Sequence, residues 1–157
     1  MKKNFLLAPA CCLFLAACTL TTGVFEKNVA IPGHQWQSSF QPELVFNIQD
    51  TTSLYNIYFV IRHTDAYHFN NIWISASVRQ PGDTAALSQK YDLTLSSNDK
   101  GWLGSAMDDI WEQRVLLQPL TKFSRAGDYH FSIRQIMRED PLKEVLNAGI
   151  RVEKVRQ

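Results

Sequence analysis

Apolar and polar residues alternate with a period of two over several stretches of the chain, a pattern typical of half-buried β-strands. In residues 72–79 the alternation puts four apolar side chains on one face, those of Ile72, Ile74, Ala76 and Val78. Turn residues such as Pro81-Gly82-Asp83 separate the stretches. Further strands are predicted at residues 44–48, 91–95, 110–117 (followed by Pro119), 129–133 and 149–155.

Two stretches depart from this alternation. Residues 54–61 are apolar on both faces, so they predict a central strand that is covered on each side, with loops or the N-terminal segment covering the second side. Residues 142–148 resemble a short helix, because Pro141 suits its first position, Asp140 can cap it and Gly149 can end it. The chain therefore predicts an all-β fold, an antiparallel β-sandwich with Ig-like or jelly-roll connectivity and one short helix near the C-terminus.

The first residues predict a bacterial lipoprotein signal peptide over residues 1–17. Two lysines precede a short apolar run at residues 5–15, and Leu-Ala-Ala leads directly into Cys18. The run is too short to cross a bilayer, which needs about 20 apolar residues. We therefore expect Cys18 to become the first mature residue and its sulfur to carry a diacylglyceryl group. An ordinary signal peptide cut near Ala17 is the alternative.

After the signal, residues 18–23 are small or polar and predict a lipidated tether, and residues 24–157 predict one domain. The whole chain has a formal net charge of +1, and removal of Lys2 and Lys3 takes it just below zero. This balance argues against nucleic acid or anionic lipid as the main partner. Cys11 and Cys12 leave with the signal, so the domain has no cysteine pair for a disulfide. No second apolar run is long enough to span a membrane.

Two polar clusters contain potential metal ligands, but neither has the spacing of a dedicated metal site. One is formed by His63, Asp65 and His68, and the other by Asp108, Asp109 and Glu112. Structural zinc sites use tighter paired spacings, and calcium loops space their acidic residues around a glycine. We interpret both clusters as loop or turn residues that bond to nearby backbone groups. Neither a metal nor a cofactor is predicted.

The chain also lacks the common catalytic motifs. It contains no Gly-x-Ser-x-Gly, no His-Glu-x-x-His and no phosphate-binding glycine-rich loop. Asp99 and Asp109 could in principle hydrolyse a glycosidic bond, but that reaction depends on the separation of two carboxyl groups, which the sequence does not give. We therefore expect a protein that is not an enzyme, and rank a small hydrolase below a binding function.

Aromatic residues in two loops suggest a binding surface. Tyr67, Phe69, Trp73 and Trp102 could stack on sugar rings or contact a protein partner. The alternative, which we favour, is that they pack beneath loops, because Trp is highly buried on average. The segment Arg138-Glu139-Asp140 has a similar ambiguity. It either caps the short helix, with Arg138 paired to a carboxylate, or contacts a partner.

Eight stretches follow one another in a specific order along the mature chain: SLYNIY (53–58), RHTDAY (62–67), NNIW (70–73), PGDT (81–84), NDKGWLG (98–104), MDDI (107–110), QIMREDPL (135–142) and NAGIRVE (147–153). Together with the lipoprotein signal, they resemble the gliding-motility lipoprotein GldH family of Bacteroidetes. The resemblance implies a lipid-anchored protein, in the outer membrane, that is associated with gliding motility and type IX secretion and has no known enzymatic activity. It assigns no role to any residue.

We therefore expect envelope proteins of this machinery as partners, with a glycan as the alternative ligand. The expected contact residues are Tyr67, Asn70, Asn71, Trp73, Asp99, Trp102, Arg138 and Asp140. Trp102 and Arg138 are the expected anchors, because Trp and Arg dominate binding hot spots. Residues 19–22 are not acidic, whereas surface export of Bacteroidetes lipoproteins tends to use an acidic stretch there. This difference favours the periplasmic face.

Overall fold

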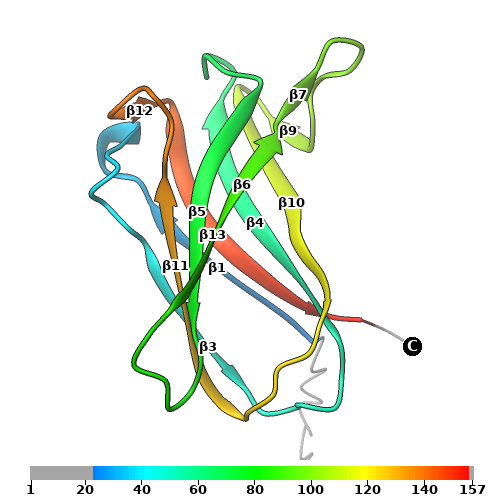
Figure 1. Ribbon diagram of the computed structural model, residues 1–157. Coiled ribbons are helices and arrows are strands. Elements are labelled where there is room, and N and C mark those ends of the chain that lie inside the picture. Colours follow the sequence, from blue (N-terminus) through cyan, green and yellow to red (C-terminus); the bar gives the residue numbers. More distant parts are fainter. Residues whose placement is uncertain (1–22, 156–157) are drawn as a thin grey trace, which may run out of the picture.

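The computed structural model describes residues 23–155, which form a sandwich of two antiparallel sheets (Figure 1). The five-stranded sheet contains, in spatial order, β1 (Val24–Ala30), β13 (Val145–Lys154), β4 (Tyr55–Thr64), β10 (Ile110–Thr121) and β9 (Ser105–Met107). The four-stranded sheet contains β3 (Glu43–Ile48), β11 (Gly127–Gln135), β5 (Asn71–Arg79) and β6 (Leu87–Thr94). The predicted β-sandwich is confirmed.

Short elements complete the fold. β2 (Gln35–Trp36) pairs with β12 (Leu142–Lys143), β7 (Ser96–Ser97) pairs with β8 (Gly101–Trp102), and η1 (Pro32–His34) is a single 3-10 turn. Within residues 23–155 no helix is both long enough and apolar enough to cross a membrane. The predicted signal peptide, Cys18 and most of the tether lie outside the described residues.

The core fills the space between the inner faces of the two sheets. Ile72 and Ile74 of β5 are fully buried, and Ala76 and Val78 further along the strand are half-buried, so the predicted apolar face points inward. Trp73, between the two isoleucines, faces outward. The period-two pattern therefore predicted both the strand and the orientation of its side chains.

β4 is the central strand that its sequence predicted, paired with β13 on one side and β10 on the other. Its outer face is covered by side chains of neighbouring strands, and not by a loop. Arg114 of β10 is the register partner of Val60 and donates to Glu26 of β1 over 2.9 Å, so this ion pair lies across β4 and β13. Val60 is consequently 1% exposed.

The predicted helix at residues 142–148 is wrong. Leu142 belongs to β12, and β13 begins at Val145, four residues before the predicted strand. β13 is hydrogen-bonded to β1 and β4, and Val145 and Ala148 are fully buried. Pairing on both edges, together with this burial, stabilises the extended backbone more than the local capping signals stabilise a helix.

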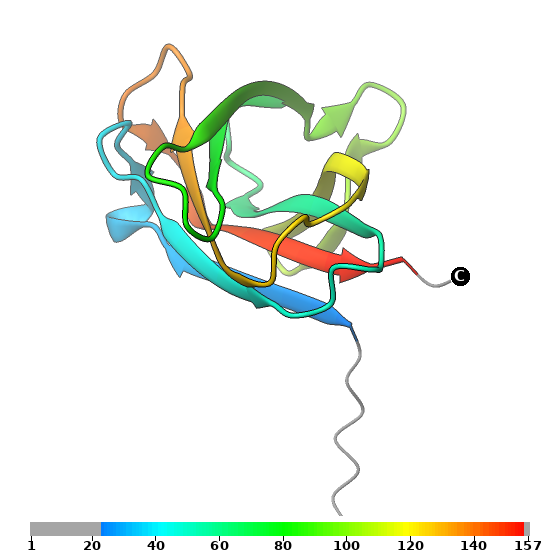
Figure 2. The ribbon, with the colours of Figure 1, turned by 60° about the horizontal axis from the view of Figure 1, so that its bottom comes forward.

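The strands give the sandwich two ends, which we call proximal and distal. The proximal end is where β1 begins, with Val24 opposite Glu153 and Thr121 opposite Tyr55. It carries the loops at residues 49–54, 80–86 and 122–126 and lies at the bottom of Figure 1; Figure 2 brings it forward. The distal end, at the top, carries the loop at residues 65–70, the β7–β8 hairpin and the segment at residues 136–141.

Candidate functional site

All eight predicted contact residues lie at or near the distal end, although they come from separate parts of the chain. Tyr67 and Asn70 belong to the β4–β5 loop, Asn71 and Trp73 to the start of β5, Asp99 and Trp102 to the β7–β8 hairpin, and Arg138 and Asp140 to the segment between β11 and β12. Two of these regions meet directly, because His68 Nδ1 lies 3.9 Å from a Glu139 carboxylate oxygen and the Trp73 N–H donates to Met137 Sδ over 3.1 Å.

Several of the aromatics pack inside the distal end and do not form an exposed platform. The His63 ring lies 4.6 Å from the Trp102 ring and 5.2 Å from the Tyr67 ring, between ring centroids. Phe69 packs on Tyr67 at 5.8 Å, and Tyr67 is only 4% exposed. Its hydroxyl donates to the Asn71 carbonyl over 3.1 Å. Tyr67 and Trp102 therefore stabilise the loops that carry them.

His63 is held in one neutral form. Its Nδ1 lies 2.8 Å from the Thr64 carbonyl, which can only accept, so Nδ1 donates. Its Nε2 accepts from the Gln113 side-chain amide over 3.1 Å, and that amide also donates to the Leu95 carbonyl over 2.9 Å. Burial lowers the His63 pKa below its usual value, against the raising effect of the Thr64 bond. Both ring nitrogens are occupied, so His63 is not placed to act as a catalytic base.

The acidic cluster before β10 also has structural partners. Asp108 has a positive φ of 55° in the turn, and the Asp109 carbonyl accepts from the Asp65 N–H over 2.8 Å. Glu112 pairs with Arg62 and Arg114. Among residues 23–155, no three His, Cys, Asp or Glu side chains are arranged to hold a metal ion.

Two more of the predicted contact residues hold distal segments together. Asp140 accepts from the backbone N–H of Ser38 over 2.9 Å and from the Gln135 amide over 3.3 Å. Hydrogen bonds from Ser38 lower the Asp140 pKa. Asn71 donates to Asp92 over 2.6 Å. Asp140 thus ties the end of β11 to the η1–β3 region, a role different from the predicted helix cap.

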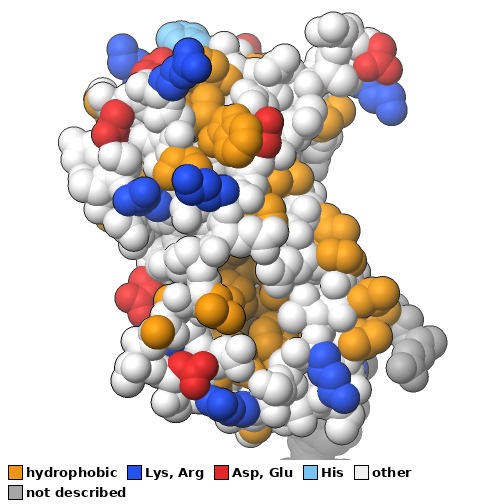
Figure 3. All heavy atoms as spheres, viewed as in Figure 1, with side chains coloured by type: hydrophobic (Ala, Val, Ile, Leu, Met, Phe, Trp, Pro, Cys, Tyr) orange, Lys and Arg blue, Asp and Glu red, His pale blue; other side chains and the backbone are white. Residues whose placement is uncertain are grey.

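The remaining four residues, Asn70, Trp73, Asp99 and Arg138, are exposed. Trp73 is 42% exposed on the outer face of the four-stranded sheet, opposite Asp92 of β6. Lys90 and Arg134 flank Ser75, the next outward residue along β5. In Figure 3, basic side chains surround an apolar area on the upper half of this face. We call Trp73, Lys90, Asp92 and Arg134 the Trp73 patch.

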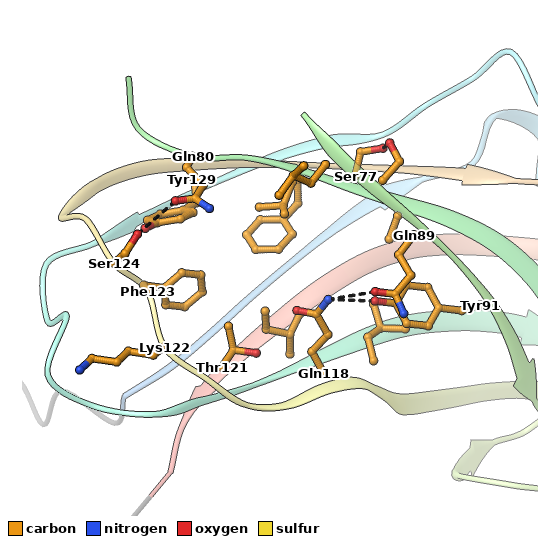
Figure 4. A pocket seen from close by; sticks show the side chains of 17 residues that line it. Ser77, Gln80, Gln89, Tyr91, Gln118, Thr121, Lys122, Phe123, Ser124 and Tyr129 are labelled. Atoms are coloured by element: carbon orange, nitrogen blue, oxygen red, sulfur yellow. Dashed lines mark hydrogen bonds between the residues drawn. The ribbon is translucent and has the colours of Figure 1, made fainter. Parts of the chain in front are cut away.

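At the proximal half the two sheets enclose a pocket of about 300 Å³ that sequence reasoning missed. Figure 3 shows it as a hollow in the lower half of the molecule, and Figure 4 shows its lining. Its apolar lining includes Ile57, Val78, Leu117, Phe123, Tyr129 and Phe131. These residues look like ordinary core positions in the sequence, so no motif could have marked the pocket.

The course of β10 explains why the pocket exists. Its pairing with β4 shifts register between Leu116 and Gln118 and again between Gln118 and Thr121, an interval that contains Pro119. Such bulges bend a strand, and proline, which has no N–H to donate, is tolerated at edges and bulges. β10 therefore continues four residues past the predicted end at 117, but it is distorted there and faces β6 across the pocket.

Comparison with known proteins gives a consistent family assignment. The family model described as GldH lipoprotein matches residues 23–152. The gliding motility lipoprotein GldH homolog of Christiangramia forsetii is 26% identical over 139 residues, covering 83% of each chain. The gliding motility lipoprotein GldH of Flavobacterium johnsoniae is 25% identical over 138 residues, covering 83% of this chain and 84% of its own.

Solved structures are more distant. A carbohydrate-binding module specific for non-crystalline cellulose aligns with a TM-score of 0.44 and 9% identity, over 83% of this chain and 73% of its own. The Cry4Aa toxin of Bacillus thuringiensis aligns with a TM-score of 0.44 and 16% identity, over 84% of this chain and 21% of the toxin. Neither alignment is close enough to inform ligand or fold. The family match extends over nearly the whole described sandwich, and the chain belongs to the GldH lipoprotein family.

Proposed function

We propose that this protein is a non-enzymatic, accessory or assembly component of the gliding motility machinery and the associated type IX secretion machinery. Both curated relatives are named as gliding motility lipoproteins, which supports a lipid-anchored envelope protein with a role in gliding. In our proposal acyl chains on Cys18 hold the domain at the periplasmic face of the outer membrane. Confinement to a membrane plane raises its effective concentration for partners in that plane, as a short linker does.

The observation that carries the proposal is the placement of the exposed contact residues. β1 starts at the proximal end, and only five peptide steps separate Gly23 from Cys18. The proximal end is therefore held near the membrane, while Asn70, Asp99 and Arg138 lie at the opposite end. In our proposal, this arrangement presents the distal end to partners in the periplasm.

The chemistry of the distal end also supports a binding function over catalysis. The buried histidine has both ring nitrogens bonded, and the acidic cluster is paired with arginines or used in a turn. The exposed contact residues include Trp73, among basic side chains, and Arg138, whose guanidinium has no ion-pair partner among residues 23–155. Trp and Arg are the residue types most enriched in binding hot spots. We therefore move the proposed anchor from Trp102 to Trp73 and retain Arg138.

The direct test is crosslinking affinity purification of a tagged full-length protein from its own envelope. Stoichiometric recovery of gliding or secretion components is the expected result. Recovery of the protein alone, or with polysaccharide only, would contradict the assembly role, and the second outcome would favour a glycan-binding function. Flotation of the same sample with membranes, compared between the native chain and Cys18→Ser, reports separately on the lipid anchor.

Trp73→Ala is expected to reduce partner recovery about tenfold and to leave the melting temperature unchanged. A tenfold loss corresponds to roughly 1.4 kcal/mol of binding free energy, as for the loss of a binding hot spot. Leu116→Ala is the matched control, because Leu116 is exposed to a similar extent, 45% against 42%, but lies in the half of β10 that borders the pocket. Equal recovery from both folded variants would exclude Trp73 as an anchor.

A further inference from the structure

The proximal pocket has an apolar part that suits a narrow apolar ligand: nine of its lining residues are apolar or aromatic, and the other eight are polar. The Phe123 ring lies 4.5 Å from the Tyr129 ring and 5.2 Å from the Tyr55 ring, so packed aromatics form one wall. The Tyr129 hydroxyl donates to the Arg125 carbonyl over 2.9 Å and accepts from the Arg125 N–H over 3.3 Å, so it presents no unpaired polar group to the pocket. A volume of about 300 Å³ is at the lower end of the range for ligand pockets.

The pocket opens between two strand edges that do not pair with each other. Within the part of the chain that the structure describes, β6 pairs with β5 alone, and β9 covers β10 only at residues 110–112. Across the gap the Gln118 amide donates to the Tyr91 hydroxyl over 3.1 Å and approaches Gln89 Oε1 at 3.4 Å (Figure 4). Leu87 lines the opening and is 69% exposed. The Gln118 bonds bridge the gap, so a narrow apolar ligand would enter past Leu87, on the proximal side of these bonds.

The pocket lies in the half of the molecule that the tether holds near the membrane. A fully extended chain from Cys18 to Gly23 reaches at most about 18 Å, so a lipidated Cys18 keeps Gly23, at the proximal end, within that distance of the anchor. Phe123 and Ser124, which line the pocket, belong to one of these loops.

One uncompensated positive charge lies beside the pocket on the membrane side. Lys122 lines the pocket, and its side chain extends away from the apolar centre toward the proximal end (Figure 4). The neighbouring charges are already paired, Arg125 with Asp83 at 2.7 Å and Lys154 with Asp50 at 2.6 Å. Among the described residues, Lys122 has no ion-pair partner. This charge complements the anionic head group of a lipid whose tail lies in the pocket.

We propose that the pocket binds one acyl chain of an anionic membrane phospholipid, with Lys122 next to the head group. The proposal rests on the lipid anchorage proposed above, which brings the pocket to the membrane. Binding of this kind would fix the orientation of the sandwich on the bilayer, in addition to tethering it, and would direct the distal end toward the periplasm in a defined pose.

The test uses full-length lipidated protein in phosphatidylethanolamine vesicles that contain phosphatidylglycerol with a photoreactive diazirine in one acyl chain. After irradiation, mass spectrometry locates the crosslinked peptides. We expect crosslinks on pocket segments, around Leu117 and Phe123. Phosphatidylcholine with the same photoreactive chain is expected to give at least threefold lower yield, because its head group carries no net charge.

Two variants and one matched control separate the pocket from general membrane contact. Ala76→Phe places a large ring in the pocket and is expected to lower the pocket crosslinks at least fivefold. Ser75→Phe, its neighbour on the outward face of the same strand, is expected to leave them unchanged. Lys122→Gln is expected to remove the preference for phosphatidylglycerol over phosphatidylcholine.

Crosslinks spread over the surface, or an equal yield from Ala76→Phe and Ser75→Phe when both are folded, would overturn the proposal. Pocket crosslinks that appear only in the Cys18→Ser variant would also overturn the proposal. That result would mean that the acyl chains of the protein's own anchor fill the pocket in the native protein. Vesicle flotation is measured in parallel. If the native protein does not float with the vesicles, the proposed lipid anchorage is wrong, but lipid binding by the pocket is not yet tested. Crosslinking to the same photoreactive lipid, added in micelles, then tests the pocket independently of the anchorage.

Discussion

The two ends of the sandwich use their side chains in opposite ways. At the distal end, His63, Tyr67 and Trp102 pack against one another, and the polar atoms of His63 and Tyr67 are bonded to nearby groups. At the proximal end, ordinary strand residues such as Val78 and Leu117 surround space that no side chain fills. The residues most conspicuous in the sequence are therefore mainly structural, and the proximal pocket is bordered by inconspicuous ones.

This contrast shows that residue identity and available space are separate indicators of function. An aromatic residue contributes to binding only where the fold leaves it exposed, as at Trp73. A pocket arises where two sheets diverge, and here the bulges of β10 around Pro119 separate its edge from β6. The following predictions test whether the distal end is closed and the proximal end open.

The largest expected effect is at the distal end. Tyr67→Ala should lower the free energy of unfolding by about 3 kcal/mol, because it leaves a cavity beneath the loops. Tyr67→Phe, which removes only the bond to the Asn71 carbonyl, should cost about 1 kcal/mol. Leu117→Ala in the pocket should also cost only about 1 kcal/mol, because its side chain already borders open space. Urea unfolding of the three variants measures these free energies. Equal losses of unfolding free energy for Tyr67→Ala and Leu117→Ala would show that the distal end is no more tightly packed than the pocket.

An intermediate effect concerns the pH dependence of stability that His63 gives to the distal end. The unfolded chain protonates His63 with an ordinary pKa near 6.5, whereas burial lowers the folded-state pKa. This contribution to stability is therefore complete above pH 6.5 and is lost as pH falls from 6.5 toward the folded-state pKa. Melting temperatures between pH 8 and pH 5 should fall more for the native chain than for His63→Phe. His34→Phe, at an exposed histidine, is the control and should behave like the native chain.

The smallest effect is expected from filling the pocket. Ala76→Phe should change the free energy of unfolding by less than about 1 kcal/mol, because the ring can enter existing space. The same substitution at Ala148, which is fully buried between closely packed strands, should cost about 3 kcal/mol through overpacking. Chemical denaturation of the pair measures this contrast. A large loss at both positions would show that the proximal pocket is as tightly packed as the core.

Much of the fold was predictable, because strand patterning is local. The alternation at residues 72–79 gave a strand with Ile72 and Ile74 inside, and the apolar run at 54–61 gave the central strand β4. The cover over Val60 was harder to predict, since it depends on an ion pair between Arg114 and Glu26, which are 88 residues apart. At residues 142–148 the local pattern predicted the wrong element, a helix, because genuine capping signals were outweighed by pairing with two neighbouring strands.

The candidate site was predictable only in part. The sequence placed the contact residues in loops, but whether a loop side chain is free depends on what packs beneath it. Trp73 and Trp102 are the same residue type, yet one lies on an outer sheet face and the other against His63. The sequence also predicted that the acidic residues before β10 belong to a turn, and the positive φ of Asp108 agrees with it.

The sequence by itself determined the family, the β-sandwich class and the inward face of most strands, because each depends on the order and period of residues along the chain. It also predicts a lipoprotein signal peptide over residues 1–17, immediately before Cys18, and this stays a prediction. Only the tertiary structure decided that residues 142–148 are extended, that Tyr67 is buried and that a pocket opens beside Pro119. These features depend on distances between strands far apart in sequence, which no local pattern encodes.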